Sequence, residues 1–137
     1  AAYIAGLIDG EGTITLSRRH ANERRQLVVS IVNTERDILD WVLTQIGVGK
    51  VTSKRTTSPK HAPSFTYSIS NRQALALLRQ VVPFLRSYKR IRAGMAVDHY
   101  MSVTPRNGRY NPAQDAARTQ FEIVFLAVKA GSTRLTD

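Results

Sequence analysis

The chain has 137 residues, of which 42% are hydrophobic, a size and composition typical of one folded domain with a single core. Twenty Lys and Arg residues oppose ten Asp and Glu residues, a net charge of +10, and a folded domain this basic usually has a polyanionic partner. The absence of cysteine excludes disulfides and cysteine-ligated zinc, and no apolar run reaches the ~20 residues of a membrane span.

The N-terminal residues predict a helix followed by a β-hairpin. In AAYIAGLIDGEG the apolar residues keep helical spacing over residues 1–9, and Gly10 and Gly12 are expected to end the helix. From Gly12 onward Ile or Leu alternates with Thr or Ser, a period of two that predicts a strand over residues 12–19. The sequence HANERR then turns the chain, and residues 24–32 alternate in the same way. We expect these two strands to pair.

The same helix-then-hairpin order is predicted a second time. Thr34, with Asp37 three residues later, resembles a capping box and predicts a helix through Ile46. Five elements are predicted after it: strands over residues 50–56 and 64–70 on either side of the loop TTSPKHAP, and helices from Asn71 toward Pro83, from about Ser87 to Tyr100 and from Ala113 to about Ala130. Asn71 is expected to cap the first of these later helices.

The order α-β-β-α-β-β-α, followed by further helices, predicts an α+β fold with one four-stranded antiparallel sheet. Each strand places apolar residues on one face and polar or basic residues on the other, the pattern of an antiparallel sheet that helices cover on one side only. The expected inward residues are Ile14, Leu16, Leu27, Val29, Ile31, Val51, Phe65, Tyr67 and Ile69. We expect the whole chain, residues 1–137, to form a single domain.

Residues 4–12, IAGLIDGEG, resemble the LAGLIDADG signature of the homing endonucleases. They depart from it at three positions, where Ile4, Gly10 and Glu11 stand in place of Leu, Ala and Asp. The resemblance extends past the motif, because the order of elements over residues 1 to about 85 is that of the family and a basic helix follows. It implies an αββαββα core whose curved antiparallel sheet forms a saddle for DNA, with additional C-terminal helices. Family members are typically encoded within introns or inteins.

Small residues line one side of the first predicted helix. Ala2, Gly6 and Gly10 lie four residues apart, and the neighbouring row includes Ala5. Such a face allows a second helix to approach closely, although small residues also pack beneath a domain's own sheet. The motif occurs once, and the similar segment AGMAVD lacks a following Gly-acid-Gly, so a second such helix has to come from another copy of the chain. We therefore expect a C2 homodimer. Its predicted interface residues are Ala2, Ala5, Gly6 and Asp9.

Glu11 comes directly after the first predicted helix, so in the dimer two Glu11 carboxylates would meet near the axis. Two carboxylates brought together repel each other unless a cation lies between them. Mg²⁺ combines a few carboxylates with phosphate oxygens and water, and a pair of metals about 4 Å apart stabilises the attacking and leaving oxygens in phosphodiester hydrolysis. The resemblance implies that Glu11 is a metal ligand in each subunit, assisted by the Gly10 carbonyl, and that Mn²⁺ or Ca²⁺ can replace Mg²⁺ for binding. The alternative is that Glu11 is an exposed acid in a turn.

The resemblance also implies further polar residues around this centre. Asn33, where the family more often has Gln, is the amide at the end of the second strand and would hold the attacking water. Arg36 is the nearby cation, and Lys89 is the lysine on the helix after the sheet. The alternatives are a helix cap for Asn33 and solvated charges for Arg36 and Lys89. The three histidines show no spacing typical of a metal site or an HNH-type site.

The polar faces of the four strands carry residue types that hydrogen-bond to base edges, and a β-ribbon fits a major groove about 12 Å wide. The predicted DNA-binding positions are Thr13, Thr15, Ser17, Arg19, Arg24, Gln26, Val28, Ser30, Lys50, Thr52, Lys54, Ser64, Thr66 and Ser68. None of them is acidic, which favours a polyanion over water as their partner. An eight-residue strand spans ~27 Å, so two subunits would cover about 16 base pairs. The cations expected to contact phosphates are Arg86, Arg90, Arg92, Arg106 and Arg109.

These features predict a homodimeric, Mg²⁺-dependent, site-specific DNA endonuclease that makes a double-strand break in a long pseudo-palindromic site. Two alternatives share the fold. An intron-splicing maturase would bind RNA and lack cleavage, whereas a DNA-binding regulator would read double-stranded DNA without cutting it. Intact Glu11, Asn33 and Lys89 argue against the maturase, and the lack of a clear helix-turn-helix after the sheet argues against the regulator. No membrane partner is expected, and the resemblance implies a soluble intracellular protein, in an organelle or the bacterial cytoplasm.

Overall fold

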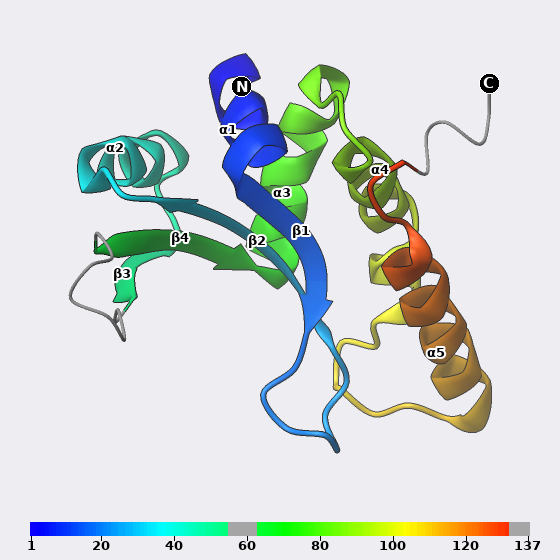
Figure 1. The fold of residues 1–137 in the computed structure, drawn as a ribbon. Coiled ribbons are helices and arrows are strands. Elements are labelled where there is room, and N and C mark those ends of the chain that lie inside the picture. The colour runs from blue at the N-terminus through cyan, green and yellow to red at the C-terminus, as the bar shows by residue number, and fades with distance from the viewer. Residues whose placement is uncertain (55–62, 132–137) are drawn as a thin grey trace.

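The elements follow in the predicted order (Figure 1). The computed structural model describes residues 1–54 and 63–131. Its elements are α1 (Ala2–Glu11), β1 (Gly12–Ser17), β2 (Gln26–Asn33), α2 (Arg36–Ile46), β3 (Lys50–Lys54), β4 (Ser64–Ser70), α3 (Asn71–Val81), α4 (Lys89–His99) and α5 (Pro112–Ala127), with short 3-10 turns at Val82–Phe84 and Met101–Val103. The αββαββα order and the α+β class are thus confirmed. The predicted loop TTSPKHAP lies outside the described residues except for Pro63.

α1 is longer than predicted, because it continues through Gly10 and Glu11 and ends at Gly12. The Gly12 N–H donates to the Ile8 carbonyl, and the chain then enters β1 directly. A Cβ at Gly12 would lie 2.8 Å from both the Ile8 Cα and the Ser30 carbonyl oxygen. Glycine at position 12 therefore allows the helix end to approach β2 closely.

Two predicted helix caps are wrong. The N-cap residue of α2 is Glu35, not Thr34, and no side chain caps the helix there. Asn71 is the first residue of α3, with a φ of 53°. Its side chain donates to Gln26 and accepts from the Tyr100 hydroxyl. Asn71 therefore makes tertiary contacts between β2, α3 and α4 in place of the expected cap.

The four strands form one antiparallel sheet in the order β1-β2-β4-β3. Its apolar face is buried under the helices, while the opposite face is left open (Figure 1). Of the predicted inward residues, all are buried except Val51 and Phe65, which are only partly buried and pack against the core. The register places Thr13, Ser30, Ser68 and Lys50 side by side in one row across the open face.

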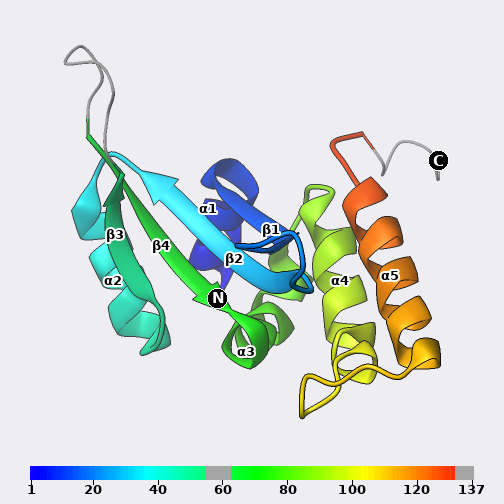
Figure 2. The same cartoon turned by 90° about the horizontal axis from the view of Figure 1, so that it is seen from below.

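α4 and α5 lie side by side next to the β1 side of the sheet (Figure 2). Arg92 of α4 joins them, because it donates to the carbonyls of Val128 at 2.8 Å and of Ile14 at 2.9 Å. The guanidinium of Arg92 thus holds the end of α5 against β1, and the phosphate contact expected of Arg92 stays a prediction. No helix within residues 1–54 and 63–131 is long and apolar enough to cross a membrane.

Candidate functional site

Glu11 and Asn33 meet where α1 runs into the sheet. Asn33 Nδ2 donates to Glu11 Oε2 at 3.0 Å, and Asn33 Oδ1 accepts from the Glu35 N–H at 2.8 Å. The amide thus orients the carboxylate and also holds the start of α2. Glu11 is exposed, and its second carboxylate oxygen has no hydrogen-bond partner among the described residues. That oxygen is available to a ligand.

Asp9 fastens the end of α1 to the segment that precedes α4. Its carboxylate accepts from the Arg86 N–H at 2.8 Å, the Ser87 N–H at 3.1 Å and Ser87 Oγ at 2.5 Å. Burial acts to raise the pKa of Asp9, but the hydrogen bonds from Ser87 and Arg86 and the charge of Lys89 outweigh burial and hold the pKa below its ordinary value. Asp9 is therefore an ionised structural contact within the subunit.

Lys89 is buried at the same junction, with 8% of its surface exposed. Its Nζ donates to the carbonyls of Ile8 and Asp9, both at 2.8 Å, and so satisfies the C-terminal end of α1, where the helix dipole favours a cation. Burial lowers the pKa of Lys89, and the neighbouring Asp9 charge partly offsets this. No hydrogen bond or ion pair joins Lys89 to Glu11 within the described chain. Lys89 thus lies beside the predicted centre, but its ammonium points to the helix end.

Arg36 makes its contacts on α2 and β4. It forms an ion pair with Asp40 at 3.6 Å and stacks over the Phe65 ring at 5.5 Å. Its interactions in residues 1–54 and 63–131 do not include Glu11 or Asn33. A catalytic role for Arg36 stays a prediction.

The described part of this chain gathers no complete set of metal ligands by itself. Within the described ranges, no three His, Asp or Glu side chains gather closely enough to hold an ion. Glu11 offers one free carboxylate oxygen, a hard ligand of the kind Mg²⁺ prefers, and Mg²⁺ takes its other ligands from phosphates and water. The residues present therefore fit Mg²⁺ provided that a second carboxylate and phosphate oxygens come from outside the chain.

The exposed side of α1 carries the small residues Ala2, Gly6 and Gly10 beside one large side chain, Tyr3, which packs edge-on against Trp41. A Cβ added at Gly6 or Gly10 would meet nothing within 4 Å, so the packing of the subunit does not require glycine at either position. Ala2 is exposed like these glycines, whereas Ala5 is fully buried in the core of the chain. Of the predicted interface, Ala2 and Gly6 are thus accessible, while Ala5 packs inward and Asp9 bonds to the segment before α4.

The open face of the sheet holds most of the predicted DNA-binding positions. The exposed ones are Thr13, Ser17, Gln26, Lys50 and Thr52, and the partly exposed ones are Thr15, Val28, Ser30, Ser64, Thr66 and Ser68. β1 ends at Ser17, two residues earlier than predicted, so Arg19 is exposed in the β1–β2 connection. Thr13 and Ser30 share a hydrogen bond of 2.7 Å. The sequence analysis missed two further residues of this face, since the register pairs Val32 with Thr66 and Ser70 with Val28. The side chain of Lys54 lies outside the described part.

Arg24 does not belong to the open face. Its guanidinium forms ion pairs with Asp115 and Glu122 of α5, and the hydrogen bond to Asp115 raises its pKa. β2 begins at Gln26, so the alternation that suggested an outward Arg24 continues two residues beyond the strand. The DNA contact expected for Arg24 is therefore replaced by a contact between the β1–β2 connection and α5.

Three solved structures of DNA complexes are similar to this chain. The homing endonuclease I-CvuI in complex with its target has a TM-score of 0.75 and 16% identity over 93% of this chain and 80% of that chain. The archaeal intron-encoded homing endonuclease I-Vdi141I complexed with DNA has a TM-score of 0.62 and 16% identity over 93% of this chain and 82% of that chain. The LAGLIDADG meganuclease I-AabMI bound to uncleaved DNA has a TM-score of 0.65 and 20% identity over 88% of this chain and 42% of that chain. This chain has the LAGLIDADG homing-endonuclease fold. A scan against protein-family models and a search of curated proteins found no match.

Within this LAGLIDADG fold, the motif residues 4–12 form most of α1 and its junction with β1. Ser87 was not among the predicted site residues, and Arg86 was expected only to contact phosphates, but the backbone N–H groups of both bind the motif's Asp9 from 77 and 78 residues away. The only sequence signal for Ser87 is its position two residues before Lys89, which places the two residues together at the start of the helix predicted from about Ser87.

Proposed function

We propose that this chain is a LAGLIDADG homing endonuclease that binds double-stranded DNA as a homodimer and cuts both strands with the help of Mg²⁺. One observation carries the proposal: an exposed carboxylate, Glu11, is oriented by Asn33 at the end of a helix whose outer side includes Gly6 and Gly10. A second copy packed along α1 would bring a second Glu11 next to the first. The two carboxylates would then be able to hold divalent ions against a DNA phosphate.

The glycines of α1 support the homodimer. A glycine inside a helix destabilises it by about 1 kcal/mol relative to alanine, and the subunit gains no packing at Gly6 or Gly10 in return. A closely approaching helix would explain both residues. The chain covers 80% of I-CvuI but 42% of I-AabMI, so the I-AabMI chain is long enough for two units of this size. A chain with a single unit would obtain the second α1 from another copy.

The open sheet face supports duplex DNA as the substrate. Its described residues are hydroxyl, amide, valine and lysine side chains without a carboxylate, and the neighbouring I-CvuI, I-Vdi141I and I-AabMI structures are DNA complexes. Thr, Ser and Gln hydrogen-bond to base edges, and the methyl groups of Thr and Val fit the thymine methyl. The rows across four strands would present these groups to one major groove.

In the proposed reaction each residue at the junction has a separate task. Glu11 would be the metal ligand of each subunit, with the Gly10 carbonyl beside it. Asn33 would fix the direction of that carboxylate and hold the attacking water through its amide. Asp9 and Lys89 would act as positioning residues, because their bonds fix the end of α1 from which Glu11 projects. Mg²⁺, when bound, would polarise the phosphate and lower the pKa of the attacking water.

A cleavage assay with a matched acid variant tests the proposal. A DNA pool with randomised sequence is incubated with the protein and Mg²⁺ at low salt, and cut sites are recovered and resynthesised. Glu11→Gln is expected to bind the recovered site and leave it uncut. Glu35→Gln changes another exposed acid close to Asn33 and is expected to cut normally. Cleavage by Glu11→Gln at the wild-type rate would refute the role of Glu11. A wild-type protein that binds duplexes but never breaks them with any divalent ion would replace the proposal with a binding role, as maturase or regulator.

A further inference from the structure

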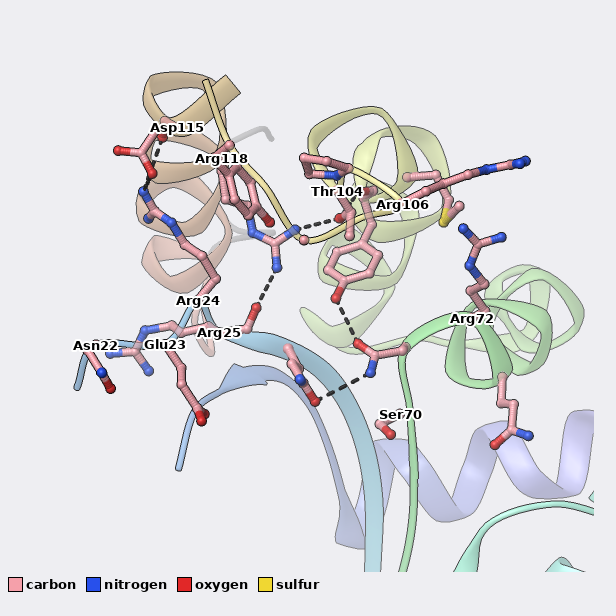
Figure 3. A pocket seen from close by; sticks show the side chains of 18 residues that line it. Asn22, Glu23, Arg24, Arg25, Ser70, Arg72, Thr104, Arg106, Asp115 and Arg118 are labelled. Atoms are coloured by element: carbon pink, nitrogen blue, oxygen red, sulfur yellow. Dashed lines mark hydrogen bonds and ion pairs between the residues drawn. The ribbon is translucent and has the colours of Figure 1, made fainter. Parts of the chain in front are cut away.

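A cavity of about 890 Å³ opens at the hairpin end of the sheet (Figure 3). It lies between the start of β2, the start of α3 and the segment that joins α4 to α5. Its lining is rich in guanidinium groups, which come from Arg24, Arg25, Arg72, Arg106 and Arg118. No residue of the proposed cleavage site lines it.

Three of these arginines build the wall of the cavity. Arg118 is 1% exposed and donates to Thr104 Oγ1 at 2.5 Å and to Glu122 at 3.3 Å. Arg24 and Arg25 lie 3.4 Å and 3.8 Å from carboxylate oxygens of the same Glu122. Their charges are therefore largely matched within the protein. They hold the β1–β2 connection and α5 at a fixed separation.

Arg72 and Arg106 are different, because both are exposed and neither forms a hydrogen bond or ion pair with any described residue. Figure 3 shows their guanidinium groups on the same side of the cavity, one from the start of α3 and one from the α4–α5 segment. Of the two acids in the lining, Asp115 is paired with Arg24, and Glu23 lies across the cavity from Arg72. Two unmatched guanidinium groups in one cavity repel each other and favour an anion between them.

The cavity continues onto the open face of the sheet. It shares Glu23, Gln26, Ser70 and Gln73 with a second hollow, of about 710 Å³, which is also lined by face residues such as Lys50 and Ser68. β1 leads away from Glu11 toward this end, and its six residues span ~20 Å, which is about six base pairs. If a duplex lies on the sheet, the base pairs that β1 contacts end before the cavity, and the cavity faces the base pairs that follow them.

We propose that Arg72 and Arg106 bind phosphodiester groups of the duplex that flanks the stretch read by the strands. The inference rests on the proposed function in one respect, that DNA lies on the sheet, and it does not depend on cleavage. The phosphates there would add affinity without sequence preference, since backbone contacts position a duplex and do not read it. Each subunit would extend its contact with DNA by the phosphates that the two arginines reach.

The test compares two duplexes that share a selected site. One duplex ends where the strands end, and the other extends ten base pairs further on each side. Binding is measured without divalent metal over a range of salt for the wild type, Arg72→Gln/Arg106→Gln and Arg79→Gln. Arg79 is the matched control, because it is also an exposed arginine of α3 without a partner among the described residues, two turns from Arg72.

The wild type is expected to bind the longer duplex more tightly, and the double variant is expected to lose this preference. Its salt slope on the longer duplex should fall by about two for each subunit, since each lost phosphate contact reduces the slope by ~0.9. Ethylation of single phosphates should interfere with wild-type binding in the flanks and no longer interfere for the double variant. Arg79→Gln should behave as the wild type.

The other outcomes separate the two proposals. A double variant with unchanged slope and unchanged flank preference would overturn the role of Arg72 and Arg106 and leave the endonuclease proposal standing. Wild-type protein that binds no duplex would overturn both. Binding of inorganic phosphate at the two arginines, followed by NMR, without any effect of the flanks would assign the cavity to a free anion and overturn its role in DNA binding.

Discussion

Replacing Gly6 of α1 with alanine should have opposite effects on the stability of one subunit and on the association of two. Within the subunit the added methyl group would meet nothing within 4 Å, and the backbone at Gly6 does not have a positive φ. Alanine favours the helix by about 0.8 to 1 kcal/mol relative to glycine. An isolated subunit carrying Gly6→Ala should therefore be more stable by up to about 1 kcal/mol.

The dimer should respond in the opposite direction. Each subunit would bring one extra methyl group to the place where the two α1 helices are proposed to touch. Overpacking of this kind destabilises a close contact by about 1 to 3 kcal/mol. The dissociation constant of the dimer should therefore rise roughly 5- to 150-fold, since 1.4 kcal/mol corresponds to a factor of ten.

Sedimentation equilibrium measures the dissociation constant, and urea unfolding at two protein concentrations measures stability with and without association. Gly94→Ala is the matched control, because Gly94 is also helical, lies in α4 and has open space around its Cβ position. It should stabilise the protein by about 1 kcal/mol and leave association unchanged. If Gly6→Ala raised stability at every concentration and did not weaken association, as expected for Gly94→Ala, the proposal that α1 forms the dimer contact would be refuted.

Two further predictions concern the stability of the fold. Asp9→Asn should lower the free energy of unfolding by about 2 to 3 kcal/mol, because one amide oxygen cannot accept all the hydrogen bonds that the carboxylate receives from Arg86 and Ser87. The pKa of folded Asp9 lies below its ordinary value, so the stability advantage of the wild type should be complete above about pH 4 and should vanish as the pH falls through the folded-state pKa. Urea unfolding midpoints of the wild type and Asp9→Asn across the acid range measure this pH dependence. Gly49→Ala should destabilise by about 2 to 3 kcal/mol, because its φ is +104° and the new Cβ would lie 2.6 Å from the Tyr67 hydroxyl. Gly47→Ala, with a φ of +85° and open space, should show the backbone effect alone, and equal losses in the two variants would contradict this explanation.

The arrangement of elements was predictable because it depends on local patterns. The change from helical spacing to alternation at Gly12 fixes the start of β1, and the same alternation identifies which side of each strand is buried. The family resemblance implied that Asn33 lies around the same centre as Glu11, and the structure brings the two residues into a hydrogen bond. Glu11 precedes the start of β1 and Asn33 ends β2. Because the two strands are paired and antiparallel, these positions lie at the same end of the sheet.

The rest depended on contacts between distant segments, which sequence spacing does not describe. Lys89 was expected either to lie near the metal centre or to be a solvated charge. Its ammonium instead binds the carbonyls at the end of α1, 80 and 81 residues earlier. Arg24 and Arg92 looked like surface cations, yet both hold α5 in place. A basic composition cannot distinguish an arginine that binds DNA from one that supports the surface on which DNA would lie.

The ion pairs around Glu122 connect the last described helix to the outer tip of the first hairpin. A shortened version that ended after α4 would still contain every strand of the sheet and the whole motif. It would nevertheless leave the two hairpin arginines, Arg24 and Arg25, without the carboxylates of Asp115 and Glu122 that neutralise them. Efforts to miniaturise this scaffold for genome engineering, or to fuse it head to tail, must therefore retain α5, because its acids balance the charge of the β1–β2 connection.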